Sequence, residues 1–334
     1  MRGGGAWLSL VITVGQGDAF PPPGLEAAAA LAGAEVEVLL VLAQGVPRPE
    51  PGSLPPGLRV LFQPAGGLAA ARDLAVTQAR GRVIFFTRAG CLPPPDLARR
   101  LAGHFSQPGV VAVGGAIVPS NPEEPLARLA ACDLALGLAA LAGVEHPCPH
   151  LACAAFERRA LQEAGLFDQS LPDSASCDPI LAHRLVAAGG VLVFDPELQV
   201  RMPLPAHWGG LWRGQLERGR QRYRELRRLG GAPADLRTPD QFPPWQPLVV
   251  LLSGGLAGFL GRLDPAQGLT LAAACLLLLY PLNRSFLKQV AEQEPDLLQR
   301  ALAFSLLRPA AWTLGLMSAA LKRIVGDAPL DKGV

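Results

Sequence analysis

The residues of this chain best suited to chemistry surround a short apolar strand predicted over 83–87. That strand ends at Thr87, next to Arg88, and the preceding Ala-rich helix, predicted over 68–79, carries Arg72. Ligands of α/β sheets bind at the carboxyl ends of the strands. Because a guanidinium group matches phosphate oxygens bidentately, both arginines are candidates for holding a phosphate-bearing ligand. A solvated surface arginine is the alternative for Arg88.

A second candidate is Asp178, which stands immediately before Pro179 at the start of a helix predicted over 178–188. An aspartate in this position commonly accepts hydrogen bonds from the first free N–H groups, and proline favours the first helical turn. Judged by its residues alone, the segment therefore predicts a helix cap.

These candidates depend on an alternation of short apolar strands with helical stretches. The alternation predicts an α/β fold with a doubly wound, mostly parallel sheet. The run at 7–14 is predicted to be a buried first strand rather than a signal peptide. The predicted strands span 8–14, 35–42, 59–62, 83–87, 110–118 and 191–194. The predicted helices span 24–32, 68–79, 95–104, 124–138, 158–165 and 178–188.

Composition divides the chain into two regions. Half of its 334 residues are apolar and 17% are charged, against about 25% charged in a typical soluble protein. The charge-poor stretches lie late in the sequence, so we expect one domain over 1–235 and a hydrophobic helical region over 242–325. This region is predicted to be membrane-associated, with a hairpin over about 245–283 and a third helix over about 299–322. A buried soluble helical subdomain is the alternative.

Charge and cysteine usage narrow the class of partner. Seven arginines fall within 213–228, as in a cytoplasmic flank beside a membrane, with a solvated helix face as the alternative. No Arg/Lys stripe is interleaved with aromatic residues, which argues against nucleic acid as a partner.

Six scattered cysteines show no disulfide framework and favour a reducing compartment. The group His146, Cys148, His150 and Cys153 is either a crowded zinc site or part of a Pro-rich loop.

The stretch 66–92 resembles the family 2 glycosyltransferases, which have a GT-A fold. The family pattern is an Ala-Arg-Asn helix, a glycine and an apolar strand running into Asp-x-Asp. Residues 71–73 (Ala-Arg-Asp), Gly81 and the strand match that pattern. The resemblance continues in order over about residues 7–230.

The resemblance implies a divalent metal that bridges the donor diphosphate, but three of its ligand positions are changed. Thr87 and Ala89 stand in place of the two aspartates, and Met202 stands in place of a histidine. We therefore expect a transferase with no metal and no other cofactor, with Mg²⁺ or Mn²⁺ as the alternative. The positive charge beside the diphosphate would then come from Arg88 and Arg72.

Three further groups of residues take roles from the resemblance. Asp178 falls on the catalytic general base, which suits direct inverting displacement and is compatible with capping, and Cys177 falls on the glutamate before it. Gln44 stands where the family has an acid that contacts the base or ribose, and its amide can bind a base edge. Phe156 and Arg158 belong to the segment that builds the acceptor pocket.

The resemblance implies a membrane-associated, hexosyltransferase-like enzyme with its catalytic domain in the cytoplasm. It would move a sugar, with inversion, from a nucleotide-sugar donor to a lipid-linked or polysaccharide acceptor. The changed acids favour a rival interpretation, a catalytically inactive transferase-fold scaffold or binding protein in polysaccharide or cell-envelope biosynthesis. A third possibility is an unrelated α/β protein, because fold resemblance alone does not establish chemistry.

Overall fold

The computed structural model describes residues 6–15, 18, 22–50, 52–142, 144, 146–169, 177–228, 236–237, 245–260, 262 and 264–325. The chain divides into two compact units. Unit 1 comprises residues 1–122, 134–204 and 233–239, and unit 2 comprises 123–133, 205–232 and 240–334. Helix α4 (Pro125–Ala139) contributes residues to both.

Unit 1 is built on a seven-stranded sheet in the order β3-β2-β1-β4-β7-β5-β8. Neighbouring strands are parallel except β7, which is antiparallel to β4 and to β5. The mostly parallel sheet predicted from the sequence is thus confirmed. The strands are β1 (Leu8–Val14), β2 (Val36–Leu42), β3 (Leu58–Phe62), β4 (Val83–Arg88), β5 (Val110–Pro119), β7 (Ala154–Glu157) and β8 (Val191–Met202). A separate pair joins β6 (His146–Pro147) to β9 (Leu236–Arg237).

Burial on both faces explains the sequence of the central strands. Every residue of β1 is buried, as expected for a parallel strand covered by helices on both sides. Two features differ from the prediction. Strand β7 was not predicted, because its four residues give too short an apolar run to separate from the helix that follows. Strand β8 runs to Met202 because the register shift after Asp195 lets pairing with β5 resume at Gln199.

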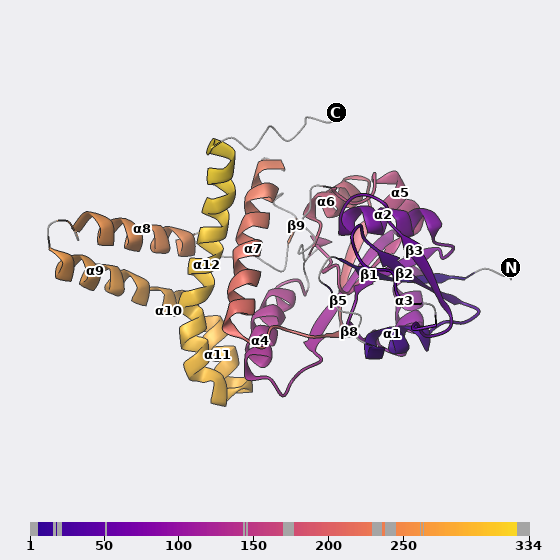
Figure 1. Ribbon diagram of the computed structural model, residues 1–334, viewed down its shortest axis with the longest axis horizontal. Coiled ribbons are helices and arrows are strands. Elements are labelled where there is room, and N and C mark those ends of the chain that lie inside the picture. The colour runs from indigo at the N-terminus through magenta and orange to yellow at the C-terminus, as the bar shows by residue number, and fades with distance from the viewer. Residues whose placement is uncertain are drawn as a thin grey trace. The chain divides into compact units, whose positions relative to one another are not determined.

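Helices cover both faces of this sheet (Figure 1). Helices α2, α5 and α6 contribute side chains to the same buried cluster as β1, β2 and β4, and Figure 1 draws these three helices together on one side. The helices of unit 1 are α1 (Pro22–Ala29), α2 (Leu68–Gln78), α3 (Leu97–Phe105), α5 (Arg158–Glu163) and α6 (Pro179–Ala187). Layers of this kind are the doubly wound arrangement.

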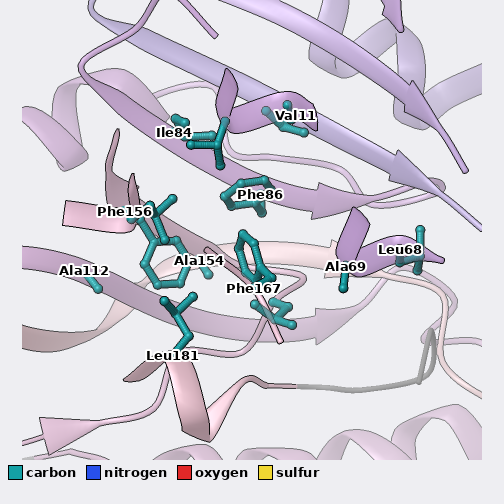
Figure 2. Close-up of a cluster of buried hydrophobic side chains, with 14 of the residues drawn as sticks. Val11, Leu68, Ala69, Ile84, Phe86, Ala112, Ala154, Phe156, Phe167 and Leu181 are labelled. Carbon is teal, nitrogen blue, oxygen red and sulfur yellow. The ribbon is translucent and has the colours of Figure 1, made fainter. Parts of the chain in front are cut away.

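Three phenylalanines from separate elements form the centre of this core (Figure 2). The ring centroid of Phe86 in β4 lies 5.1 Å from that of Phe167 and 6.1 Å from that of Phe156 in β7, in edge-to-face geometry. Such pairs add about 0.5–1.5 kcal/mol each beyond the area they bury. This packing holds the loop that contains Phe167 against both β4 and β7.

The described residues of unit 2 are mostly helical, and part of α4 belongs to this unit as well. The other elements described for unit 2 are α7 (Trp208–Arg228), α8 (Trp245–Leu260), α9 (Pro265–Leu277), α10 (Leu279–Leu282), α11 (Arg284–Gln293), the 3₁₀ turn η1 (Pro295–Leu297) and α12 (Leu298–Val325). Helices α8 and α9 lie side by side as a hairpin (Figure 1). The helices expected over about 245–283 and 299–322 are therefore present. Within the described ranges, no helix has both the length and the apolar character needed to cross a bilayer.

Helices α7 and α12 cross in backbone contact. A Cβ atom added to Gly219 of α7 would lie 1.9 Å from the carbonyl oxygen of Trp312, and one added to Gly315 of α12 would lie 1.9 Å from that of Leu216. No side chain fits at those distances, so glycine is required on both helices. Small residues at a crossing allow this close approach of two helix backbones.

Buried charge joins three helices of unit 2. The carboxylate of Asp133 in α4, only 6% exposed, accepts hydrogen bonds from Gln215 (3.1 Å) and Arg218 (3.2 Å) of α7. It also forms an ion pair with Arg308 of α12. Burial raises the pKa of Asp133, but Arg308 and Arg218 outweigh this effect and hold the pKa below its ordinary value.

The same network supports a proline inside α12. Pro309 has no N–H, so the carbonyl group of Ser305, one turn earlier, loses its usual helical donor. The side-chain amide of Asn283 donates to that carbonyl (3.5 Å) and to the carbonyl of Leu279 (2.7 Å), while its oxygen accepts from Arg308. A side chain from outside α12 thus replaces the missing donor.

Candidate functional site

The carboxyl ends of β1, β2 and β4 lie at one edge of the sheet, because the three strands are parallel and in register. The N–H of Ala89 donates to the carbonyl of Thr13 (3.1 Å), which places the end of β4 beside the end of β1. Strand β8 reaches the same edge, where Leu92 and Arg201 exchange two backbone hydrogen bonds of 2.8 and 3.1 Å. The structure therefore brings Thr87, Arg88 and Ala89 to the same edge as Met202.

Thr87 serves the scaffold of this edge. Its side chain is buried, and its hydroxyl donates to the carbonyl of Ala152 (2.9 Å). Its own carbonyl accepts from the hydroxyl of Thr13 (3.1 Å). The hydroxyl of Thr87 is thus engaged with the backbone that leads into β7.

Arg88 is paired with an acid that the sequence reasoning missed. Its Nη2 atom lies 3.2 Å from Oδ1 of Asp18, and the two side chains are 29% and 23% exposed. Oδ2 of Asp18 accepts from the N–H of Gly15 (2.8 Å), which ties the pair to the end of β1. The available signal was an acidic residue shortly after the first strand, since parallel strand ends share one edge.

Gln44 lies at the end of β2 and contacts backbone. Its Oε1 atom accepts from the N–H of Gly66 (3.2 Å), in the loop that leads into α2. This bond connects the ends of β2 and β3 at the carboxyl edge. Contact between Gln44 and a nucleobase stays a prediction.

Arg72 is buried, in contrast to Arg88. Its side chain is 1% exposed, and its guanidinium carbon lies 5.7 Å from the ring centroid of Phe167. The side chain therefore takes part in packing α2 against the Phe167 loop, at a distance typical of a cation–π contact. Contact between Arg72 and a phosphate group stays a prediction.

Asp178 is the N-cap of α6, as its residues predicted. Oδ1 accepts from the N–H of Leu181 (2.9 Å), and Oδ2 accepts from the N–H of Asp168 (2.9 Å). The side chain is 3% exposed; burial raises the pKa of its carboxyl group, and the two backbone hydrogen bonds oppose that shift. The preceding Cys177 is buried as well. The predicted role of Asp178 as a general base stays a prediction.

The two residues assigned to the acceptor side lie elsewhere. Phe156 is 2% exposed and belongs to the core. Arg158 follows Glu157, which pairs with Val83 at the start of β4, so Arg158 lies at the amino edge of the sheet, opposite Arg88. Its guanidinium donates to the carbonyl of Ala79 (2.6 Å). The structure does not bring Arg158 together with the other predicted site residues.

Among the described residues at the carboxyl edge, the side chains at the three expected ligand positions do not fit a divalent metal. The hydroxyl of Thr87 is engaged, Ala89 and Met202 offer no oxygen, and Asp18 is paired with Arg88. Across the part of the chain that the structure describes, no three His, Cys, Asp or Glu residues gather as metal ligands. This includes the candidate zinc group, in which His150 instead accepts from the N–H of Ala152 (3.2 Å).

A second missed acid, Asp73 of α2, lines a shallow depression of about 260 Å³. Oδ1 of Asp73 accepts from the N–H of Phe167 (3.0 Å), and the amide of Gln169 donates to Oδ2. Burial raises the pKa of Asp73 to about 6; the Phe167 hydrogen bond opposes this, and the charge of Asp178 adds to it. The sequence did contain a signal, because Asp73 occupies the asparagine position of the Ala-Arg-Asn pattern.

Comparison with known proteins gives one family and one fold. Residues 37–165 match the family model "Glycosyl transferase family 2". Among solved structures, the chain is similar to the mannosyltransferase PcManGT from Pyrobaculum calidifontis, which was solved in complex with GDP-Man and Mn²⁺. The two chains share 19% sequence identity, and the TM-score is 0.51. The match covers 96% of this chain and 88% of that chain. A mycobacterial protein matches with 16% identity, 68% and 76% coverage, and a TM-score of 0.46. No curated protein matches the chain.

The family match covers the part of unit 1 from β2 to α5 and includes Arg72, Arg88 and Phe156. It supports a family 2 glycosyltransferase. The likeness to the mannosyltransferase shows a shared fold, in agreement with the GT-A-like sheet expected from the sequence.

Proposed function

We propose that the chain is a glycosyltransferase that moves a sugar, with inversion, from a nucleotide-sugar donor to a lipid-linked or polysaccharide acceptor. The observation that carries the proposal is the family 2 match over 37–165, within which Arg88 ends β4 at the carboxyl edge. The solved mannosyltransferase of similar fold was captured with GDP-Man. That relative supports a nucleotide-sugar as the donor class.

The proposed transfer does not depend on a metal. The acceptor oxygen attacks the anomeric carbon, the bond from that carbon to the diphosphate oxygen breaks, and the nucleoside diphosphate leaves with the bonding electrons. Negative charge then grows on the diphosphate, where the guanidinium of Arg88 can donate two parallel N–H bonds to its oxygens. Asp18 pairs with Arg88, so the diphosphate would take the place of this carboxylate when the donor binds.

We assign the general-base role to Asp178, which takes the proton of the attacking hydroxyl. Burial raises the pKa of its carboxyl group, and a raised pKa makes the carboxylate a stronger base near neutral pH. Its two backbone hydrogen bonds fix the direction of the carboxylate. Capping and catalysis use the same position at the start of α6.

We further propose that unit 2 binds a membrane surface and that unit 1 works in the cytoplasm. The α8–α9 hairpin exposes large apolar side chains, including Phe259 (67%) and Leu269 (68%). The arginines of α7 supply the basic character that anionic headgroups attract. The described cysteines are all free thiols, as suits a reducing compartment.

A second candidate function is an inactive binding or scaffold protein in polysaccharide or cell-envelope biosynthesis. The burial of Asp178 and the internal pairing of Arg88 with Asp18 favour it. Both features satisfy the site residues without any ligand.

Calorimetric titration with a panel of nucleotide sugars, alongside nucleoside-diphosphate release with and without a chelator, tests the proposal. Arg88→Gln should weaken donor binding or turnover about 100-fold. Arg82 precedes the same strand at the opposite edge and is 60% exposed, so Arg82→Gln is the matched control and should change neither. Asp178→Asn should stop turnover and leave donor binding intact.

The remaining outcomes separate the two candidates. Turnover that stops on chelation would contradict metal independence. Donor binding without turnover in the unaltered chain would favour the scaffold function, and no donor binding at all would reject the transferase.

A further inference from the structure

The depression beside Asp73 lies outside the row of residues assigned to the donor. It opens along one side of α2, where Ala70, Asp73, Leu74 and Thr77 follow one another at helical spacing. Its lining residues are Gln63, Ala70, Asp73, Leu74, Thr77 and Gln169. Four of the six are polar, and they come from the end of β3, from α2 and from the Phe167 loop.

The hydrogen bonds that these polar side chains already make determine what they can offer a ligand. The amide of Gln63 donates to the carbonyl of Ala65 (2.7 Å), and the hydroxyl of Thr77 donates to the carbonyl of Leu74 (2.8 Å). The amide of Gln169 donates to Asp73. These side chains direct donors to the protein itself, so what they have left for a ligand is mainly acceptor oxygen.

Such a lining selects against anions and in favour of hydroxyl groups. The charges of Asp178, Arg72 and Arg184 all act on Asp73, but the residues that line the depression include a carboxylate and no cation, so a phosphate would meet like charge and acceptors instead of donors. A neutral polyhydroxyl ligand supplies the donors that the lining lacks. Ala70 and Leu74 add a small apolar surface against which the C–H face of a sugar ring can pack.

We propose that this depression is a binding site for a neutral sugar residue, with the carboxylate of Asp73 accepting a ligand hydroxyl and Gln169 and Thr77 flanking it. Arg88 does not line this depression. The depression would therefore bind a different reactant from the donor diphosphate. In calling this sugar part of the acceptor, the inference rests on the proposed function; as a sugar site it does not.

Protonation gives the proposal a second observable. The pKa of Asp73 is raised to about 6, and the ionised carboxylate is the stronger acceptor for a hydroxyl. Sugar affinity should therefore rise as pH increases through about 6. The charged groups that act on Asp73 are Asp178 and Arg184 of α6 and Arg72 of its own helix.

The test is binding of neutral hexose oligosaccharides, first on an array and then by calorimetry with the best ligand at pH 5 and pH 7.5. Asp73→Asn should weaken binding about tenfold at pH 7.5 and abolish its pH dependence. Gln169→Ala should weaken binding to a similar degree. Gln107→Ala, an exposed glutamine outside the depression, is the matched control and should bind as the unaltered chain does.

Several results would overturn the inference: no oligosaccharide binding, binding that Asp73→Asn and Gln169→Ala leave unchanged, or preferential binding of an anion such as inorganic phosphate. Circular dichroism of each variant separates loss of the site from loss of the fold. Donor titration of the same variants should be unaltered. Sugar binding without donor binding would reject the proposed transferase and leave the sugar site supported. Donor binding without sugar binding would reject the sugar site and leave the proposed transferase supported.

Discussion

The two units of this chain differ in where they place their ion pairs and their large apolar side chains. Unit 1 encloses an aliphatic and aromatic core around Phe86 and carries its Arg88–Asp18 pair, part-exposed, at the sheet edge. Unit 2 encloses the ion pair of Asp133 and Arg308 and exposes leucines and Phe259 on the α8–α9 hairpin.

This contrast separates charges that hold structure from charges available to ligands. A buried ion pair has little net effect on stability when intact, but removing one partner leaves an uncompensated charge and is costly. A part-exposed pair can exchange its partner for a ligand at low cost. We therefore expect the donor-binding charges in unit 1, at part-exposed pairs such as Arg88–Asp18, whereas the buried Asp133–Arg308 pair aligns the helices of unit 2.

The largest expected effect comes from Asp133→Ala, which leaves Arg308 buried without its carboxylate. We expect the free energy of unfolding of unit 2 to fall by about 3–5 kcal/mol. Urea unfolding, followed by circular dichroism of the helices, measures it. Asp96→Ala removes the partner of two arginines on the surface of α3 and should cost about 0.5 kcal/mol, since one pair is exposed and the other is part-exposed. Equal losses of unfolding free energy for the two substitutions would contradict the contrast between the units.

The same residue sets an acid limit. The folded-state pKa of Asp133 lies below its ordinary value of 3.8, so its contribution to stability is complete above about pH 4. The contribution is lost as pH falls through the folded-state pKa. Asp133→Ala should flatten this part of the pH–stability profile.

An intermediate effect is expected at the crossing of α7 and α12. Gly219→Ala introduces a Cβ 1.9 Å from a backbone oxygen and forces the helices apart, at a cost of about 1–3 kcal/mol. Gly214 lies on α7 with open space around its Cα, so Gly214→Ala should stabilise the helix by up to about 1 kcal/mol. Opposite signs in thermal unfolding would support the crossing, and the same sign would contradict it.

The smallest expected effect sharpens the view of the sheet edge. Asp18→Asn keeps the acceptor for Gly15 but removes the charge that competes for Arg88. Donor affinity, measured by calorimetry, should increase a few-fold, because Arg88 no longer gives up a carboxylate on binding. Asp96→Asn is the control and should leave affinity unchanged. Weaker binding by the Asp18 variant would mean that the pair positions Arg88 and does not restrain it.

Local pattern was enough to predict most elements of the sheet. Strand β1 begins and ends where its apolar run does, and α2 and α6 lie within one residue of their predicted bounds. Apolar runs and caps are local signals, so one sequence suffices to read them. Strand β7 was missed because its four residues give no apolar run long enough to stand apart from the helix that follows.

The site was predicted only as far as sequence neighbours define it. Arg88, Thr87 and Ala89 could be placed at the carboxyl edge from the sequence because they lie at the end of β4 or directly after it. Asp18 was not recognised, because its pairing with Arg88 exists only once β1 and β4 are adjacent. The assignment of Arg158 to the acceptor side could not anticipate that antiparallel β7 carries it to the opposite edge of the sheet.

The amide of Asn283 has a consequence for how α12 is encoded. A proline near the middle of a 28-residue helix would ordinarily break it. Here the hydrogen bond that lets the helix continue past the proline comes from Asn283, in a separate segment of the chain between α10 and α11. The length of α12 is thus a property of the assembled helices, and a peptide of residues 298–325 alone would lack the group that tolerates its proline.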